Sequence, residues 1–390
     1  MASHRLTRAA GRAARISVAH AVPPVSSDRP LWVFGASSGR SYSDNAQVVH
    51  AKACQLTDRL APLWIIDPDS PDRSTVEERS GVALRETLEA HRMARSAQVI
   101  LFSHGVQDVP GMMWNRRAVR VRLGHGLTAF NRTRGRLPRS VQRMTNAIDL
   151  APVASRMEQD HKAEWGFPRS KLPITGLARW DAMLHEREGG ATTRERPLIL
   201  YAPTSRPWHS ARDISSTGRL RPVYQFLHAP RLRAALKAGE FDLAIYFHQV
   251  TRYRFGQIDW LPSEAQAITA EAELPRTIAA ADLVISDYSS ILWDALYLDT
   301  PVIFFQFDRS EHESRRGSHI DLGSRLFGPN VATSKQLLDE IDRASDDGFQ
   351  MLAWKDDREA WQQRAFAFRD ANNAQRIIMA VDERLSARSG

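Results

Sequence analysis

The chain has 390 residues, a formal net charge of +8 and a hydrophobic fraction of 43%. This length suits two domains with separate cores, and the composition is that of an ordinary globular protein, which excludes disordered and fibrous classes. A single cysteine, Cys54, excludes an intramolecular disulfide and a cysteine-rich zinc site, and it fits a reducing compartment such as the cytosol. No apolar run approaches the length that a bilayer requires.

The positive charge favours acidic partners, namely nucleic acid, anionic lipid or a phosphate-bearing polymer. Nucleic acid is disfavoured because the sequence contains no known nucleic-acid module and no basic stripe interleaved with aromatic residues. A local basic excess from Arg116 to Arg143 is a candidate surface for an anionic polymer or a membrane. Residues 1–29 form an Arg- and Ala-rich leader, which is either a weak membrane-surface anchor or a solvated terminus.

Apolar strand patterns then alternate with helical ones. The first series predicts strands over 31–34, 63–66, 98–102 and 118–123, with helices over 46–60 and 82–94. The second series predicts strands over 198–201, 241–247, 283–286 and 302–305, with helices over 222–235, 274–280, 335–344, 358–369 and 374–385. Strands that alternate with helices indicate parallel sheets.

A charged, Gly-containing stretch over 186–196 reads as a linker between the two series. We therefore expect a leader over 1–29, an N-terminal Rossmann-like domain over 30–190 and a C-terminal Rossmann-like domain over 195–390. Ligands bind such sheets at the carboxyl ends of their strands, so we expect a cleft between the two domains.

The most informative motif is the Asp-Tyr-Ser-Ser run of Asp287–Ser290, which lies between a predicted strand and a predicted helix. Backbone N–H groups at a helix N-terminus bind phosphate, so Ser289 and Ser290 are candidate ligands of a phosphorylated substrate. Plain helix capping by Ser289 or Asp287 is the alternative. Asp294, one turn later, either orients Ser290 or a ligand hydroxyl or is a surface carboxylate.

A Gly-His-Gly sequence follows the fourth predicted strand. The glycines Gly124 and Gly126 let the backbone approach a ligand, and His125 has the side chain to take a proton from an attacking hydroxyl. By itself the pattern equally describes a structural turn. His104, which precedes Gly105 after the third strand, is a lesser candidate by the same reasoning.

Further polar residues follow other strands. Arg206 has the geometry to clamp a diphosphate, and Thr204 and His248 are expected beside it; surface or interface roles are the alternatives. The Gly- and Ser-rich turn that contains Ser38 could cradle an anion, or it is a strand-to-helix turn capped by Asp44. The sequence lacks a P-loop, a His-Glu-x-x-His motif and a nucleophile elbow, which argues against kinase and hydrolase chemistry.

In this order the segments resemble the CDP-glycerol glycerophosphotransferase family, whose members build teichoic acids and related capsule polymers. The resemblance covers about 33–376. The segments that carry it are Phe34-Gly35 through Asp44-Asn45, His125-Gly126, Gly176 to Asp181, Leu200 to Arg206, Ile285 to Ser290 with Asp294, and Asp370 to Arg376. The chain departs from the family after His125, where Leu127-Thr128 replaces a Thr-Pro-Leu-Lys run, and after His248, where Gln249 replaces Pro.

The resemblance implies an α/β fold of two Rossmann-like domains facing across a cleft, the GT-B type. It implies transfer of a polyol phosphate, glycerol phosphate first, from a CDP-alcohol to a hydroxyl of a cell-wall or capsule polymer or a lipid-linked primer, with release of CMP. A nucleotide-sugar glycosyltransferase of the same fold and a non-catalytic protein that binds anionic polymer stay open as alternatives. We expect a cytoplasmic enzyme, peripheral at the inner face of the membrane, that does not bind nucleic acid.

The resemblance also distributes the candidate residues by role. His125 is the expected general base. The expected donor-binding residues are Thr204, Arg206, His248, Asp287, Ser289 and Ser290. The expected acceptor or supporting residues are Ser38, Asp44, Gly126, Arg179 and Asp294. No metal ligand is expected and no cofactor is required, with Mg²⁺ as an alternative, because arginine, histidine and a helix end can neutralise phosphate.

Overall fold

The structure is a computed structural model that describes residues 25, 27–132, 142, 145–189, 194–210, 213–248, 251, 261–270 and 273–389. The chain divides into two compact units. Within the described part, the first unit comprises the residues up to His125, those from 142 to Ala182, and those from Ala367 onward. The second comprises Gly126 to 132 and Met183 to Phe366.

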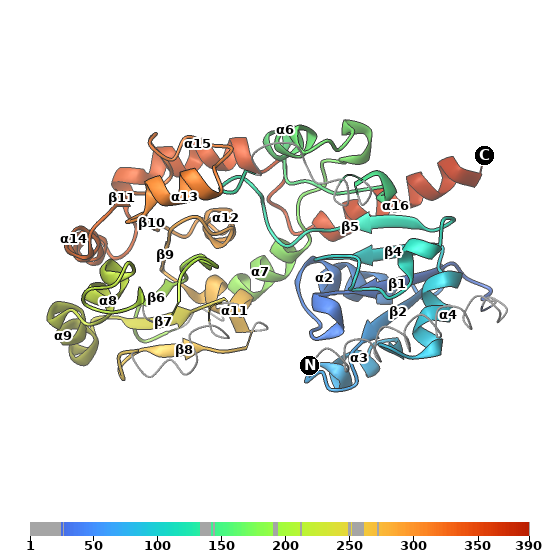
Figure 1. Cartoon of the computed structure of the whole chain (residues 1–390), viewed down its shortest axis with the longest axis horizontal. Coiled ribbons are helices and arrows are strands. Elements are labelled where there is room, and N and C mark those ends of the chain that lie inside the picture. The colour runs from blue at the N-terminus through green and yellow to red at the C-terminus, as the bar shows by residue number, and fades with distance from the viewer. Residues whose placement is uncertain are drawn as a thin grey trace. The chain divides into compact units, whose positions relative to one another are not determined.

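The first unit is built on a five-stranded parallel sheet of order β3-β2-β1-β4-β5 (Figure 1). Its strands are β1 (Leu31–Gly35), β2 (Ala61–Ile66), β3 (Gly81–Leu84), β4 (Val99–Phe102) and β5 (Val119–Arg122). Its helices are α2 (Asp44–Ala53), α3 (Arg73–Glu77), α4 (Leu88–Ser96), α6 (Arg156–Glu164) and α16 (Asn373–Ser389), and α7 (Arg179–Glu188) contains the division between the units. Short 3-10 turns occur at Ser37–Gly39, Cys54–Leu56, Met112–Trp114 and Arg169–Lys171.

The second unit is built on a six-stranded parallel sheet of order β11-β10-β9-β6-β7-β8. Its strands are β6 (Leu198–Tyr201), β7 (Asp242–Tyr246), β8 (Gln266–Ile268), β9 (Leu283–Ser286), β10 (Val302–Phe305) and β11 (Asn330–Val331). Its helices are α8 (Arg221–Leu227), α9 (Pro230–Ala238), α11 (Leu274–Ala280), α12 (Ile291–Tyr297), α13 (Arg309–Arg315), α14 (Ser334–Asp346) and α15 (Lys355–Ala365), with a 3-10 turn at Leu352–Trp354.

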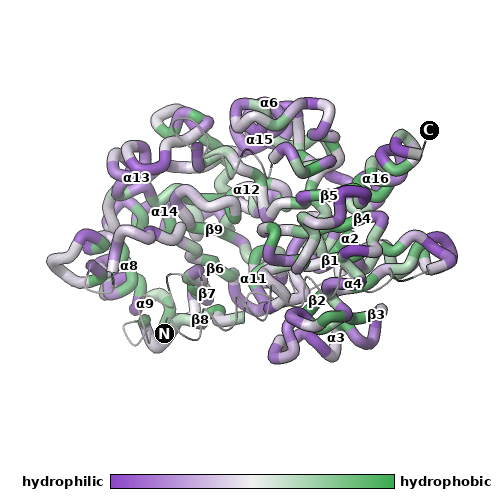
Figure 2. Tube along the Cα trace, turned by 45° about the vertical axis from the view of Figure 1, so that its right-hand side comes forward, coloured by the Kyte–Doolittle hydropathy of each residue, from purple (hydrophilic) through white to green (hydrophobic). Residues whose placement is uncertain are grey.

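The central strands are apolar along their whole length because helices cover both faces of a parallel sheet. Every residue of β1, β4, β6, β9 and β10 is buried. Figure 2 shows the contrast: hydrophobic stretches follow strands such as β6 and β9, whereas α13 is largely hydrophilic. The α/β fold class with parallel sheets, expected from the sequence, is therefore confirmed in each unit.

Side-chain caps define several helix starts. Thr87 accepts a hydrogen bond from the Ala90 N–H at the start of α4, and Ser155 accepts one from the Glu158 N–H at the start of α6. Thr333 and Gln336 form a reciprocal capping box at the start of α14. Such caps satisfy N–H groups that the first turn of a helix leaves unpaired.

The units differ from the expected domains at two places. Residues from Ala367 onward belong to the first unit, because Ile377, Ile378 and Val381 of α16 are buried in the core on one face of its sheet. Residues from Gly126 to 132 belong to the second unit. The main division after Ala182 falls near the predicted linker, of which residues 190–193 lie outside the described part.

Three short strands were not expected. β3 lies where the sequence predicts the start of a helix over 82–94, and it pairs with β2 through Val82 and Trp64. β8 and β11 have three and two residues. Of the leader over 1–29 and the basic region from Arg116 to Arg143, residues 1–24, 26, 133–141 and 143 lie outside the described part. Among the described helices none is both long enough and apolar enough to span a bilayer.

Candidate functional site

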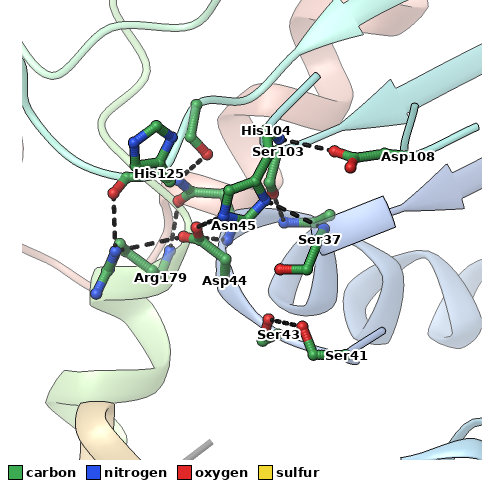
Figure 3. Close-up of polar contacts among 12 residues, drawn as sticks. Ser37, Ser41, Ser43, Asp44, Asn45, Ser103, His104, Asp108, His125 and Arg179 are labelled. Atoms are coloured by element: carbon green, nitrogen blue, oxygen red, sulfur yellow. Dashed lines mark hydrogen bonds and ion pairs between the residues drawn. The ribbon is translucent and has the colours of Figure 1, made fainter. Parts of the chain in front are cut away.

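The first unit brings two histidines together at the carboxyl edge of its sheet. His104 follows β4 and His125 follows the neighbouring strand β5. Their rings are stacked, with centroids 5.1 Å apart and planes inclined by 7°. Figure 3 shows this cluster with Asp44, Asn45 and Arg179 around it. The position of His125 after the strand is the one that the sequence indicates.

The Tyr-Ser-Asp-Asn motif holds the loop that carries His125. The Asn45 side chain donates to the Gly124 carbonyl at 3.0 Å and accepts from the Arg179 N–H at 2.9 Å. Arg179 Nη1 donates to the His125 carbonyl at 3.1 Å and lies 3.4 Å from Asp44 Oδ1. Asp44 and Arg179, both expected as supporting residues, thus fix the backbone at His125 (Figure 3).

His125 is classed as exposed as a whole residue, but neighbouring side chains crowd its ring. Burial lowers the pKa of His125 to about 4; Asp44 opposes this shift, and the charges of His104, Arg122 and Arg179 add to it. The lowered pKa leaves the His125 ring neutral near pH 7. A neutral imidazole that reaches solvent can accept a proton from a hydroxyl.

Ser38 lies in a turn whose backbone is strained. Ser37, Ser38 and Asp44 all have left-handed backbone conformations, with φ of 47°, 59° and 67°. The Asp108 carboxylate holds this turn, since it accepts hydrogen bonds from the N–H groups of Ser38 and His104 at 2.8 Å each. Ser38 therefore lies beside the histidine pair, and its N–H is already used.

In the second unit, Arg206 joins two carboxylates. Its guanidinium donates to both oxygens of Asp308, at 2.5 and 2.8 Å, and lies 2.7 Å from Asp287 Oδ2. It also donates to the Thr204 carbonyl at 2.9 Å. The group is buried. Burial alone would lower the pKa of Arg206, but Asp287 and Asp308 outweigh it and raise that pKa above its ordinary value.

Asp287 fixes the start of the predicted phosphate loop. Its Oδ1 accepts from the Thr204 N–H at 2.9 Å and from the Tyr288 N–H at 2.6 Å. Burial alone would raise the pKa of Asp287, yet the Arg206 charge and these hydrogen bonds lower it. Of the two roles that the sequence allows, donor contact and loop fixing, these contacts support loop fixing. The diphosphate clamp by Arg206 stays a prediction, and its contacts favour positioning.

The loop itself has hydrogen-bonding capacity left. Ser289 Oγ accepts from the Ile291 N–H at 3.3 Å, so capping occurs as the alternative interpretation predicts. In the described part of the chain, no hydrogen bond engages the backbone N–H of Ser289 or Ser290. Both residues are half-buried. Adjacent N–H groups without a protein partner are available to bind an anion.

The segment that follows His125 packs on this loop inside the second unit. A Cβ atom at Gly126 would lie 2.7 Å from Ser290 Oγ, and Gly126 has φ of +135°. Phe130 stacks on Trp293 of α12 at 4.9 Å, and its carbonyl lies 3.0 Å from His312 Nε2, which donates to it. His125 is thus one peptide bond from a residue in van der Waals contact with Ser290.

Arg316 is a cation near Arg206 that has no carboxylate partner among the described residues. Its closest polar contact is Asn131 Oδ1 at 3.5 Å, and its guanidinium lies 5.5 Å from the Trp208 ring. Burial lowers the pKa of Arg316, and the Arg206 charge lowers it further. By contrast, the neighbouring Arg315 pairs with Glu311 at 2.9 Å and lies over the same tryptophan at 5.2 Å.

The remaining predicted residues are placed as follows. His248 follows β7 and is exposed, and Thr204 follows β6 and is half-buried. Asp294 is fully buried in α12, so a surface role for it is wrong.

One group of side chains could hold a metal ion: ligand atoms of His209, Asp308 and Glu311 lie within 4.8 Å of one another. Both Asp308 oxygens already accept hydrogen bonds from Arg206, and Tyr288 adds a third at 3.2 Å. These contacts satisfy the Asp308 carboxylate without a metal ion.

Two further motifs of the resemblance serve the architecture. A Cβ at Gly176 would lie 1.8 Å from Asn373 Oδ1, so only glycine fits there. Asp181 accepts from the backbone N–H groups of Asn373 and Ala374, at 3.1 and 2.8 Å, and so caps α16. The Gly-x-x-Arg-x-Asp motif thus ties the C-terminal helix to the first unit.

Asn45, Asp108, Asp308 and Arg316 were not singled out as site residues in the sequence. Asn45 lies within a motif and Asp308 follows a buried strand, so their positions in the sequence could indicate site residues. Arg316 belongs to an Arg-Arg-Gly run that resembles an ordinary charged surface. Only the contact geometry distinguishes it from Arg315.

Comparisons with known proteins agree with the residue pattern. The sequence profile of the family "CDP-Glycerol:Poly(glycerophosphate) glycerophosphotransferase" matches residues 16–383. The chain is 24% identical over 227 residues to a teichoic acid glycerol-phosphate transferase of Staphylococcus aureus, covering 55% of this chain and 54% of that protein. It is 28% identical over 184 residues to a teichoic acid glycerol-phosphate primase of Bacillus spizizenii, covering 45% of this chain and 43% of that protein. The matches thus span about half the length of these curated relatives or less.

The fold is shared with a solved structure, that of the wall teichoic acid polymerase TagF. The TM-score is 0.72 at 16% sequence identity, and the match covers 97% of this chain and 94% of that one. This likeness confirms the expected fold. The family profile covers nearly the whole chain, and on that ground the protein belongs to the CDP-glycerol:poly(glycerophosphate) glycerophosphotransferase family.

Proposed function

We propose that this protein transfers an alcohol phosphate, with glycerol phosphate first, from a CDP-alcohol to a hydroxyl of a polyol-phosphate polymer or a lipid-linked primer. CMP is the second product. Family membership supports the reaction class. The name of the Staphylococcus aureus relative specifies glycerol-phosphate transfer, and one structure of TagF was determined with CDPG.

The observation that carries the proposal is the packing of Gly126 on Ser290. It brings the residue after the candidate base His125 to a loop with two free N–H groups. A base for the acceptor hydroxyl and an anion-binding loop for the donor are the two functions that phosphoryl transfer needs most. Neither the base nor the loop would by itself indicate a transferase.

The chemical step balances without a covalent enzyme intermediate. The acceptor oxygen attacks the phosphorus that carries the alcohol, and a new O–P bond forms. The bond from that phosphorus to the bridging oxygen of the diphosphate breaks, and CMP leaves with the electron pair. His125 takes the proton of the attacking hydroxyl.

The donor would bind in the second unit. The N–H groups of Ser289 and Ser290 and the guanidinium of Arg316 would neutralise its diphosphate, and His248 and Thr204 lie at neighbouring strand ends. Arg206 and Asp287 would hold the loop in place. Electrostatic groups fixed in advance in this way cost no reorganisation when charge develops. The step as written requires no metal, so CMP release should persist in EDTA.

The test measures which nucleotide donor the protein uses. Purified protein is incubated with CDP-glycerol, CDP-ribitol or a UDP-sugar, together with a short glycerol-phosphate oligomer, and nucleotide release and product mass are measured. We expect CMP and an oligomer longer by one alcohol phosphate, and neither with His125→Ala. Release of UDP alone would establish a glycosyltransferase, and oligomer binding without CDP affinity would establish a binding protein. Vesicles that carry a lipid-linked acceptor would test the proposed position at the inner membrane face.

A further inference from the structure

The first unit contains a second imidazole that the proposed reaction does not yet use. His104 stacks on His125 with ring centroids 5.1 Å apart. It comes from a different strand end, so the contact is not a consequence of sequence proximity. Figure 3 labels both histidines.

The His104 ring has a hydrogen bond on one side and a carboxylate near the other. The Ser37 N–H donates to His104 Nδ1 at 3.2 Å. A ring nitrogen that accepts a hydrogen bond carries no proton, so the hydrogen of this ring is on Nε2. His104 Nε2 lies 3.7 Å from Asp44 Oδ2. The ring therefore turns its N–H toward the carboxylate that also contacts Arg179.

The backbone around His104 is strained in a way that serves these contacts. Ser37 and Asp44, the two residues that face its nitrogens, both have left-handed conformations, with φ of 47° and 67°. A non-glycine residue in a sparsely populated conformation is unfavourable and persists only where its surroundings enforce it. Asp108 holds the backbone beside them, because it accepts hydrogen bonds from the N–H groups of Ser38, His104 and Gly105.

The contacts form a continuous network around His125. His104 faces Asp44, Asp44 pairs with Arg179, and Arg179 donates to the His125 carbonyl. His104 completes the network by stacking on the His125 ring. Both the backbone and the ring of His125 are thus held by one network. The charged and titratable groups of this neighbourhood are Arg40, Asp44, His104, Asp108, Arg122, His125 and Arg179.

We infer that His104 is a positioning residue for His125: it orients the ring of the base and, through Asp44, stabilises that ring when it takes the proton of the acceptor hydroxyl. The inference rests on the proposed function for the identity of the reaction. The geometry of the histidine pair itself does not depend on the substrate.

The experiment compares two variants at His104 with a control. His104→Phe keeps a flat ring but removes both nitrogens, and His104→Gln retains an amide that can donate to Asp44. His50→Gln is the control, since His50 is a buried histidine of the same unit that bonds Tyr42 at 2.9 Å and Ser80 at 2.9 Å. The measurements are kcat and KM for CMP release, Tm, and the NMR titration of the His125 ring protons, all below the unfolding temperature.

For His104→Phe we expect kcat to fall about 10–100-fold, the range typical of a residue that orients a catalytic group, with little change in the donor KM. We expect the His125 titration midpoint to fall, because the protonated ring loses the support that His104 supplies through Asp44. His104→Gln should recover part of kcat. His50→Gln should lower Tm and leave the His125 midpoint unchanged.

An unchanged His125 midpoint in His104→Phe would overturn the inference, as would identical behaviour of His104→Phe and His50→Gln. The titration requires no turnover. If the wild-type protein released no CMP, the proposed function would fail, and the NMR titration would still decide the role of His104.

Discussion

Gly126 and Ser290, which are 164 positions apart in the sequence, are in contact within the second unit: a Cβ built on Gly126 would lie 2.7 Å from Ser290 Oγ and 2.8 Å from Ser290 Cβ. Neither distance leaves room for a methyl group. The φ of +135° at Gly126 is also in a region that other residues rarely adopt. Two independent constraints thus require glycine immediately after the candidate base.

Gly126→Ala should therefore impair both the loop and the reaction. We expect a loss of stability of about 1–3 kcal/mol from backbone strain alone. We also expect at least a tenfold loss of CMP release, because the added methyl group would displace the Ser290 loop, which is the proposed donor site. Thermal unfolding and a donor-turnover assay measure the two effects.

Gly124→Ala is the matched control. Gly124 also has a positive φ, of +73°, but no atom lies within 4 Å of a Cβ built there. Gly124→Ala should introduce backbone strain without a steric clash, and it should therefore lose less turnover than Gly126→Ala. Equal losses of turnover in the two variants would mean that the contact with Ser290 is irrelevant.

The lowered pKa of His125 predicts the pH dependence of the reaction. With a pKa of about 4 in place of 6.5, the base is neutral across the range in which an ordinary histidine gains its proton. The acidic limb of kcat/KM should therefore lie near pH 4. His125→Ala should abolish CMP release and retain binding of CDP, which equilibrium titration would measure.

The same shift has a consequence for stability. Between pH 6.5 and about 4 the unfolded chain binds a proton at His125 that the folded chain does not, so this residue makes the fold less stable as the pH falls through that window. His125→Ala should flatten the stability curve there. An acidic limb at pH 6.5 together with an unaltered stability curve would contradict the lowered pKa of His125.

Arg316 and Arg315 provide an internal comparison for the donor site. Both guanidiniums lie over Trp208, but only Arg315 has a carboxylate partner, Glu311. Arg316→Gln should weaken CDP-alcohol binding about tenfold or more, since a charge-assisted hydrogen bond is worth roughly 1.5–3 kcal/mol. Arg315→Gln should weaken it little. Calorimetric titration with CDP distinguishes the two, and equal effects would place Arg316 outside the donor site.

Much of the fold could be predicted because long apolar strands carry a strong signal. β1, β6, β9 and β10 are continuous hydrophobic runs, and the predicted strands match them closely. β3 could not be recognised, because Val82-Ala83-Leu84 fits a helix as well as an edge strand and only pairing with β2 decides. The return of α16 to the first unit depends on tertiary contacts of Asp181 and Asn373, which no local pattern shows.

The site was predictable as far as single residues follow strand ends. His125, Asp44 and Arg179 could be named from motifs, and the structure brings them together. Their connections could not be foreseen, because they run between segments that lie far apart in the chain. The stacking of His104 on His125 and the difference between Arg315 and Arg316 are examples. A sequence gives residue types, whereas these distinctions depend on which partner each side chain meets.

The buried group of Arg206, Asp287 and Asp308 predicts how the second unit responds to acid. Asp287 has a pKa below its ordinary value of 3.8, so it contributes stability that is fully present above that pH and is lost as the pH falls through the lower folded value. Asp287→Asn leaves the buried Arg206 with one carboxylate in place of two. Removing one partner of a buried ion pair costs about 3–5 kcal/mol, so we expect a loss of that size at pH 7. We also expect a weaker dependence of stability on pH below about 4, where the ordinary pKa of an aspartate lies.

Asp357→Asn is the control: it breaks the solvent-exposed pair with Arg325 and should cost under about 1 kcal/mol. Urea unfolding at pH 7 and pH 3 measures all three proteins, and a loss in Asp287→Asn no larger than in Asp357→Asn would show that the buried group does not hold the Ser289 loop in place.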